Sequence, residues 1–213
     1  IFIRTSGCNL NCTYCDTNFA RADFCNVETF AGSMTFTKIK NPLSAEQVAA
    51  IVNNFLAVPT HSVSFTGGEP LIHWQFIRAV ADLIEAKIFL ETNGTLFNEL
   101  AKIIDIIDII SMDIKLPSMA GSNFDSHREF LKVARAKDLY VKIVITAETS
   151  REEIDAAIDL IPPEILLILQ PVTPVNGVKP ISARKILELQ EKAARKIKSV
   201  RVIPQTHRTI NIF

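Results

Sequence analysis

Cys8, Cys12 and Cys15 lie within eight residues of one another, with three residues between the first pair and two between the second. Iron–sulfur clusters in proteins are held by cysteine thiolates. Three thiolates on one short loop satisfy three irons of a 4Fe–4S cubane and leave the fourth iron without a protein ligand. A small molecule with an amino and a carboxylate group can chelate that open iron.

A structural zinc site is the alternative chemistry for these thiols. Such a site takes four protein ligands, commonly in Cys-x₂₋₄-Cys pairs, and the only other cysteine is Cys25, which we expect to be a free thiol. Four cysteines are too few for a disulfide scaffold, and their crowding suits metal ligation in a reducing compartment. The spacing therefore favours an iron–sulfur cluster and a cytoplasmic location.

A second motif, Thr66-Gly-Gly-Glu-Pro70, follows the predicted strand His61–Phe65. Glycines at the end of a strand permit positive φ and a close approach of the backbone to a ligand, and proline is common at the first position of a helix. Alone, this segment would be interpreted as an ordinary turn between a strand and a helix. Together with the cysteine loop it indicates a ligand site, with Gly68 as the closest contact.

Polar residues also follow three other predicted strands, in Glu91–Gly94, Ser111–Lys115 and Gln170–Thr173. In β/α barrels the carboxyl ends of the strands converge on one face, where active sites form. Asp113 and Lys115 are the strongest candidates, because a charged pair just beyond a buried strand needs a partner or a ligand. A purely structural ion pair is the alternative.

Short apolar segments alternate with helical patterns along the chain. The predicted strands are Ile1–Arg4, His61–Phe65, Lys87–Glu91, Ile107–Met112, Tyr140–Ile145, Glu164–Leu169 and Ser199–Ile203. The clearest helical patterns are Ser44–Ala57, Ser150–Ile161 with a capping box of Ser150 and Glu153, and Ser182–Lys198.

Repeated strand–helix units favour parallel strands with helices outside them. Six or seven strands are too few for a closed eight-stranded barrel. We therefore predict an α/β fold, a partial, TIM-like (β/α)6 barrel of mostly parallel strands, with a doubly wound open sheet as the alternative. Residues 1–213 are interpreted as a single domain with an insertion at 18–40, a segment that fits neither period.

One join is unusual. The helical pattern Phe76–Ala86 runs directly into the strand Lys87–Glu91 without a turn residue, although such connections usually need about 2–6 residues. We therefore expect residues to be missing between Ala86 and Lys87. We expect the same ahead of Ile1, where the chain starts inside a strand.

Charge and hydropathy exclude some partners. Lys+Arg and Asp+Glu are balanced at 23 each, which gives no reason to expect a nucleic acid or an anionic membrane. No apolar run approaches the roughly 20 residues of a membrane span, and no signal peptide is visible. Among the histidines, we expect His61 and His73 at packing or surface positions and His127 to be solvated, and we keep His207 as a functional candidate.

The cysteine spacing, with Tyr14 directly before the last cysteine, resembles the radical S-adenosylmethionine superfamily. Within it, Cys15–Thr17, Glu91–Gly94 and Val200–His207 resemble the 7-carboxy-7-deazaguanine synthase family, over almost the whole chain except 18–40. The resemblance implies contraction of 6-carboxy-5,6,7,8-tetrahydropterin to 7-carboxy-7-deazaguanine with loss of ammonia, in queuosine and related deazapurine biosynthesis. It also implies a 4Fe–4S cluster, S-adenosylmethionine, Mg²⁺, a homodimer, and an electron donor such as flavodoxin or ferredoxin.

The same resemblance assigns roles to individual residues. Cys8, Cys12 and Cys15 would ligate the cluster, Thr17 would ligate magnesium, and Arg4 and Thr66 would contact the pterin. The expected contacts to S-adenosylmethionine are Tyr14, Cys15, Asp16, Gly68, Asp113, Ile114, Lys115, Gln170, Pro171, Val172 and Thr173. The family's Gln-Gly-Glu-Gly segment, which precedes the first strand and touches substrate, is absent from this sequence.

Two other functions remain open. A glycyl-radical activating enzyme carries a similar cysteine loop but acts on a partner protein. A non-catalytic, metal-stabilised binding module would use the cysteines for structure alone.

Overall fold

The computed structural model describes residues 1–209. Its main sheet has seven strands, and every pairing in it is parallel. Their order across the sheet is β1 (Phe2–Thr5), β4 (Val63–Gly67), β5 (Ile88–Thr92), β6 (Ile109–Asp113), β7 (Asp138–Ile145), β8 (Leu166–Pro171) and β9 (Val200–Val202). Strands β1 and β9 are the two edges, so the curved sheet is an incomplete barrel, and the predicted fold class is confirmed.

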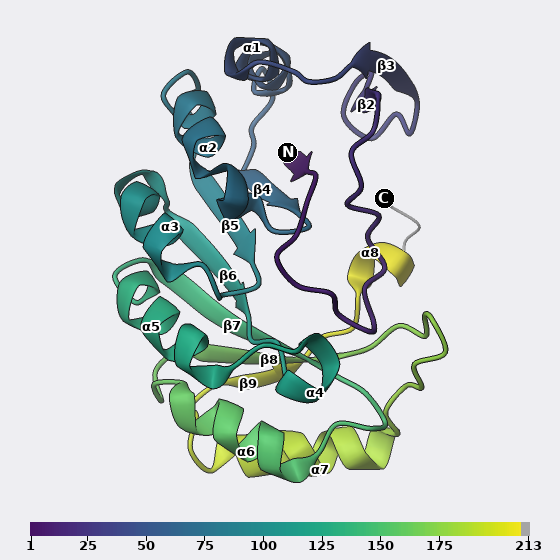
Figure 1. Ribbon diagram of the computed structural model, residues 1–213, viewed down its shortest axis with the longest axis vertical. Coiled ribbons are helices and arrows are strands. Elements are labelled where there is room, and N and C mark those ends of the chain that lie inside the picture. Colours follow the sequence, from purple (N-terminus) through teal and green to yellow (C-terminus); the bar gives the residue numbers. More distant parts are fainter. Residues whose placement is uncertain (210–213) are drawn as a thin grey trace.

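Helices cover the outer face of this sheet (Figure 1). They are α1 (Ala45–Phe55), α2 (Trp74–Ala81), α3 (Phe97–Ile103), α5 (Phe124–Ala134), α6 (Arg151–Leu160) and α7 (Ala183–Ala194). Shorter helical turns are η1 (Pro70–His73), η2 (Ile104–Ile106), α4 (Pro117–Ala120) and α8 (Thr206–Thr209). The segment that follows β1 runs beside α8 on the opposite side of the sheet from α2, α3 and α5 (Figure 1).

The seven predicted strands and the three clearest predicted helices form where the sequence pattern places them, with ends that shift by a few residues. Strand β6 is buried on both faces, as expected for a central parallel strand. Ser44 begins α1 with a complete capping box to Gln47. The box predicted for α6 is only half formed: Ser150 accepts from the Glu153 N–H, but the Glu153 carboxylate accepts instead from the N–H and hydroxyl of Ser118.

Two segments differ from the sequence pattern. Helix α2 ends at Ala81 and not at Ala86, so residues 82–87 form a connection of ordinary length to β5. The segment 18–40, which fits neither the helix nor the strand period in sequence, contains an antiparallel hairpin of β2 (Phe24–Glu28) and β3 (Phe36–Lys40). Within residues 1–209, no helix is both long and apolar enough to cross a membrane.

Candidate active site

The cysteine loop begins directly after β1, at the carboxyl edge of the sheet. Cys8, Cys12 and Cys15 are half-buried free thiols, and a turn joins the Cys15 N–H to the Cys12 carbonyl at 3.1 Å. Within residues 1–209, no three His, Cys, Asp or Glu side chains converge to hold a single metal ion. Around a cubane each thiolate binds a different iron, so a cluster does not require such convergence.

The two glycines of the Thr66–Pro70 motif pack against this loop. Gly67 has φ +136°, and a Cβ there would lie 2.2 Å from the Thr5 carbonyl oxygen. A Cβ on Gly68 would lie 2.0 Å from the Gly7 oxygen and 2.9 Å from the Cys8 Cβ. Only glycine therefore permits this approach, and it brings the motif against the backbone that carries the first cysteine.

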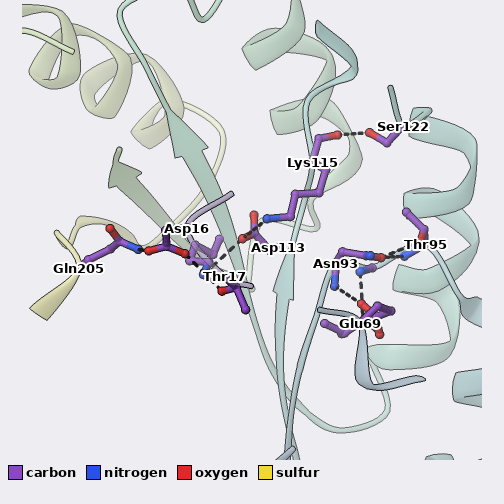
Figure 2. Close-up of polar contacts among 12 residues, drawn as sticks. Asp16, Thr17, Glu69, Asn93, Thr95, Asp113, Lys115, Ser122 and Gln205 are labelled. Atoms are coloured by element: carbon purple, nitrogen blue, oxygen red, sulfur yellow. Dashed lines mark hydrogen bonds and ion pairs between the residues drawn. The ribbon is translucent and has the colours of Figure 1, made fainter. Parts of the chain in front are cut away.

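Glu69 is a completely buried carboxylate that joins the strand ends (Figure 2). Its oxygens accept hydrogen bonds from the Leu71 N–H at 3.0 Å, the Asn93 N–H at 2.7 Å and the Thr92 hydroxyl at 2.9 and 3.1 Å. Burial raises the pKa of Glu69 to about 7, although these hydrogen bonds favour the ionised form.

A polar ring connects the end of β5 to the cysteine loop. The Asn93 side-chain amide donates to the Asn9 Oδ1 at 2.8 Å, and the Asn9 amide donates to the Thr95 hydroxyl at 2.9 Å. The Thr95 hydroxyl in turn donates to the Asn93 Oδ1 at 2.6 Å, which closes the ring. Because Asn9 lies between Cys8 and Cys12, this ring helps to fix the loop in place.

Asp113 and Lys115 form the ion pair that was the structural alternative. The Lys115 Nζ lies 2.8 Å from the Asp113 Oδ2, and the Lys142 Nζ lies 3.3 Å from the same oxygen. Burial opposes both charges, but the two lysines outweigh it and lower the pKa of Asp113, while Asp113 raises the pKa of Lys115 well above its usual range. The other oxygen, Asp113 Oδ1, is buried and has no hydrogen-bond partner within residues 1–209.

Tyr14 has a similar unpartnered atom. Its side chain packs with Met119, Val144 and Val172 and against Cys12, and its ring centroid lies 5.2 Å from the Lys115 Nζ. Its hydroxyl is buried and has no hydrogen-bond partner in the described part of the chain, and burial raises the pKa of Tyr14. Buried polar groups in native proteins are nearly always hydrogen-bonded. Tyr14 and Asp113 therefore fit a polar ligand held next to the cysteine loop.

The end of the chain meets the last part of the loop (Figure 2). The Asp16 Oδ2 accepts from the Gln205 amide at 3.2 Å and from the Arg208 guanidinium at 2.8 Å, and these two bonds lower the pKa of Asp16 although burial opposes the charge. The Thr17 hydroxyl donates to the Asp16 Oδ1 at 3.3 Å. Two hard oxygen groups thus lie side by side after Cys15. The side chain of His207 falls outside the described part of the chain.

The remaining predicted site residues occupy the same edge with varied exposure. Thr66 is buried and is the register partner of Arg4, which is exposed and whose side chain has no hydrogen bond or ion pair within residues 1–209. Ile114 is wholly buried, and its N–H donates to the Lys142 carbonyl. Gln170 and Pro171 end β8, Val172 is buried beside Tyr14, and Thr173 is half-buried.

The prediction that His127 is solvated is wrong. Its side chain is 0% exposed, and its ring contacts the Gly94 carbonyl and the Lys115 backbone. The sequence did indicate burial, because His127, Phe130, Leu131 and Ala134 follow the i, i+3, i+4, i+7 spacing of the buried face of a helix. Asn9 and Lys142 were also missed: Asn9 lies inside the cysteine motif but is not one of its thiols, and Lys142 stands in no distinctive motif.

Comparison with known proteins agrees with this geometry. Residues 2–164 match the family model described as the Radical SAM superfamily. The chain is 41% identical to a 7-carboxy-7-deazaguanine synthase of Geobacter sulfurreducens, over 98% of this chain and 88% of the relative. It is 34% identical to one of Methanocaldococcus jannaschii, over 100% and 92% of the two chains.

A solved structure shares the fold at low sequence identity. The crystal structure of a radical SAM methyltransferase from Sphaerobacter thermophilus aligns with a TM-score of 0.64 at 14% identity, over 95% of this chain and 66% of that one. The family model spans more than half of the chain, and the two curated relatives span nearly all of it. The chain therefore belongs to the radical SAM superfamily and, within it, to the 7-carboxy-7-deazaguanine synthase family.

Proposed function

We propose that this protein is a 7-carboxy-7-deazaguanine synthase, which converts 6-carboxy-5,6,7,8-tetrahydropterin to 7-carboxy-7-deazaguanine with loss of ammonia. The observation that carries the proposal is a pair of buried atoms, Tyr14 Oη and Asp113 Oδ1, that have no hydrogen-bond partner among the described residues and lie next to a loop with three free thiols. The full-length similarity to relatives named for this reaction supports the choice of substrate.

Radical SAM enzymes use a 4Fe–4S cluster and S-adenosylmethionine. Bound together, these groups supply the radical that starts the reaction. In this chain Cys8, Cys12 and Cys15 would hold the cluster, and the polar ring through Asn9 would keep their loop in place.

Several strand ends would receive S-adenosylmethionine. Asp113 Oδ1 is available to accept a hydrogen bond from a ligand hydroxyl, and Lys115 and Lys142 keep that carboxylate ionised. Tyr14 would contribute its buried hydroxyl, and Gly68 its backbone. The other contacts would come from Cys15, Asp16, Ile114 and Gln170–Thr173, as the family resemblance implies.

Magnesium and the pterin would lie on the side of Asp16 and Thr17. Hydroxyl and carboxylate oxygens are hard donors that magnesium accepts, and Thr17 would ligate the ion that orients the substrate carboxylate. Arg4 presents a free guanidinium suited to an anionic substrate, and Thr66 lies beside it on β4. We further propose a single catalytic domain, a homodimer, a cytoplasmic location, and flavodoxin or ferredoxin as electron donor.

The proposal is tested with anaerobically purified, reconstituted protein. We expect a brown, iron-containing protein that cleaves S-adenosylmethionine, and cleavage should accelerate when the pterin and Mg²⁺ are added. Colourless protein with about one zinc per chain would instead favour a binding module. If the pterin does not accelerate cleavage of S-adenosylmethionine and a radical forms on a partner protein, the protein is an activating enzyme.

A further inference from the structure

His127, in the first turns of α5, lies where the connections after β5 and β6 meet. Its Nδ1 is 2.9 Å from the Gly94 carbonyl oxygen. Its Nε2 is 3.2 Å from the Lys115 backbone nitrogen and 3.2 Å from the Lys115 carbonyl oxygen. One wholly buried imidazole thus contacts the two segments that carry Asn93 and Lys115.

The partners define the tautomer of this ring. The Gly94 carbonyl can only accept, so Nδ1 carries a hydrogen; the Lys115 N–H can only donate, so Nε2 carries a lone pair. The Lys115 carbonyl does not need a second hydrogen from the ring, because the Ser122 hydroxyl donates to it (Figure 2). A neutral imidazole protonated at Nδ1 therefore satisfies the Gly94 carbonyl and the Lys115 N–H, and burial favours this neutral form by lowering the His127 pKa.

The contact at Gly94 is closely packed. Gly94 has φ +67°, and a Cβ there would lie 2.7 Å from the Met112 side chain and 3.3 Å from the His127 Nδ1. The backbone next to Asn93 is thus held directly against the ring. On the other side, the backbone that His127 fixes belongs to Lys115, whose ammonium reaches Asp113 and the Tyr14 ring.

We propose that His127 is a positioning residue of the S-adenosylmethionine site. Its two nitrogens hold Gly94 and Lys115 in one arrangement, so that Asn93 reaches the cysteine loop and the Asp113–Lys115 pair faces the ligand. The identity of the ligand rests on the proposed function, whereas the bridge between the two connections is a property of the chain itself.

Three substitutions dissect the bridge. His127→Ala removes both contacts. His127→Asn places an amide near Nδ1 and retains the contact to Gly94, whereas His127→Gln places one near Nε2 and retains the acceptor for the Lys115 N–H. Phe130→Leu is the matched control, because Phe130 is wholly buried one turn later on α5 and contacts neither connection through a hydrogen bond.

The measurements use anaerobic, cluster-loaded enzyme: iron content, the Kd for S-adenosylmethionine, and hydrogen exchange of the Lys115 amide. We expect His127→Ala to keep its iron and to raise the Kd about tenfold, the equivalent of about 1.4 kcal/mol. The Lys115 amide should exchange faster in the Ala and Asn variants but stay protected in the Gln variant. Phe130→Leu should lower the thermal midpoint without changing the Kd.

An unchanged Kd in iron-replete His127→Ala would overturn the role of His127 and leave the proposed function intact. If Phe130→Leu raised the Kd for S-adenosylmethionine as much as His127→Ala, the role of His127 would also be overturned, because general destabilisation of α5 would then explain both increases. Iron-replete wild-type enzyme that does not bind S-adenosylmethionine would overturn the proposed function and this inference together.

Discussion

The Asn93 backbone N–H donates a 2.7 Å hydrogen bond to Glu69 Oε2, which ties the connection after β5 to the Gly-Gly turn after β4. Glu69 is completely buried, and its other oxygen accepts from the Leu71 N–H at 3.0 Å. Both carboxyl oxygens must therefore accept from the backbone. A protonated carboxyl can still do so while its hydrogen points to the Thr92 hydroxyl.

We expect Glu69→Gln to destabilise the protein by about 1–3 kcal/mol, because the amide NH₂ has no lone pair for the second backbone N–H. The pKa of Glu69 is raised from 4.5 to about 7, so its protonation stabilises the fold fully below pH 4.5 and this contribution is lost as the pH rises through 7. The thermal midpoints of wild type and variant should therefore converge from about pH 5 to pH 8. If the difference in thermal midpoint between wild type and variant widened from pH 5 to pH 8, the raised pKa of Glu69 would be contradicted.

The three cysteines should act as a unit. Replacing any one of Cys8, Cys12 and Cys15 by Ala should abolish S-adenosylmethionine cleavage and remove most of the iron, because each thiolate holds a different iron. Cys25→Ala is the matched control, since this free thiol lies on the β2–β3 hairpin. Iron content equal to wild type in Cys12→Ala would refute the ligand assignment.

Thr17→Val should weaken the response of product formation to added Mg²⁺ and leave the iron content unchanged. The substitution preserves the shape of the side chain but removes the hydroxyl that lies beside Asp16. Thr17→Ser retains a hydroxyl and should titrate with Mg²⁺ like wild type. The magnesium role would be abandoned if the Val variant gave the wild-type titration curve.

Arg4→Ala should raise the KM for the pterin about tenfold to 150-fold, because a charge-assisted hydrogen bond is worth about 1.5–3 kcal/mol. Uncoupled cleavage of S-adenosylmethionine should persist. Arg21→Ala, at another exposed arginine near the loop in sequence, is the control. A normal KM, or loss of the cluster, would place Arg4 in the scaffold instead.

The sequence predicted the sheet well because buried parallel strands are continuous apolar runs. All seven predicted strands are present, with ends displaced by one or two residues. The hairpin of β2 and β3 was missed because its strands are mostly exposed and do not alternate in hydropathy. The early end of α2 was missed because Leu83 and Ile84 continue the apolar pattern past Ala81 without remaining helical.

Motif spacing located the cysteine loop and the Gly-Gly turn, but it could not show which distant residues hold them. Asn9 and Asn93 meet across 84 positions of sequence, and Gln205 and Asp16 across 189. Such contacts follow from the parallel order of the strands, which brings their carboxyl ends to one edge. His127 was predicted to be solvated because histidine is polar, although its spacing from Phe130, Leu131 and Ala134 in the helix indicated burial.

The central claim is tested most directly by anaerobic turnover of 6-carboxy-5,6,7,8-tetrahydropterin with S-adenosylmethionine, Mg²⁺ and a reductant, with the products identified by mass spectrometry and an ammonia assay. The account predicts 7-carboxy-7-deazaguanine and an equal amount of ammonia from wild-type protein, and neither from Cys12→Ala. Unchanged pterin, recovered from iron-replete protein that cleaves S-adenosylmethionine, would contradict it.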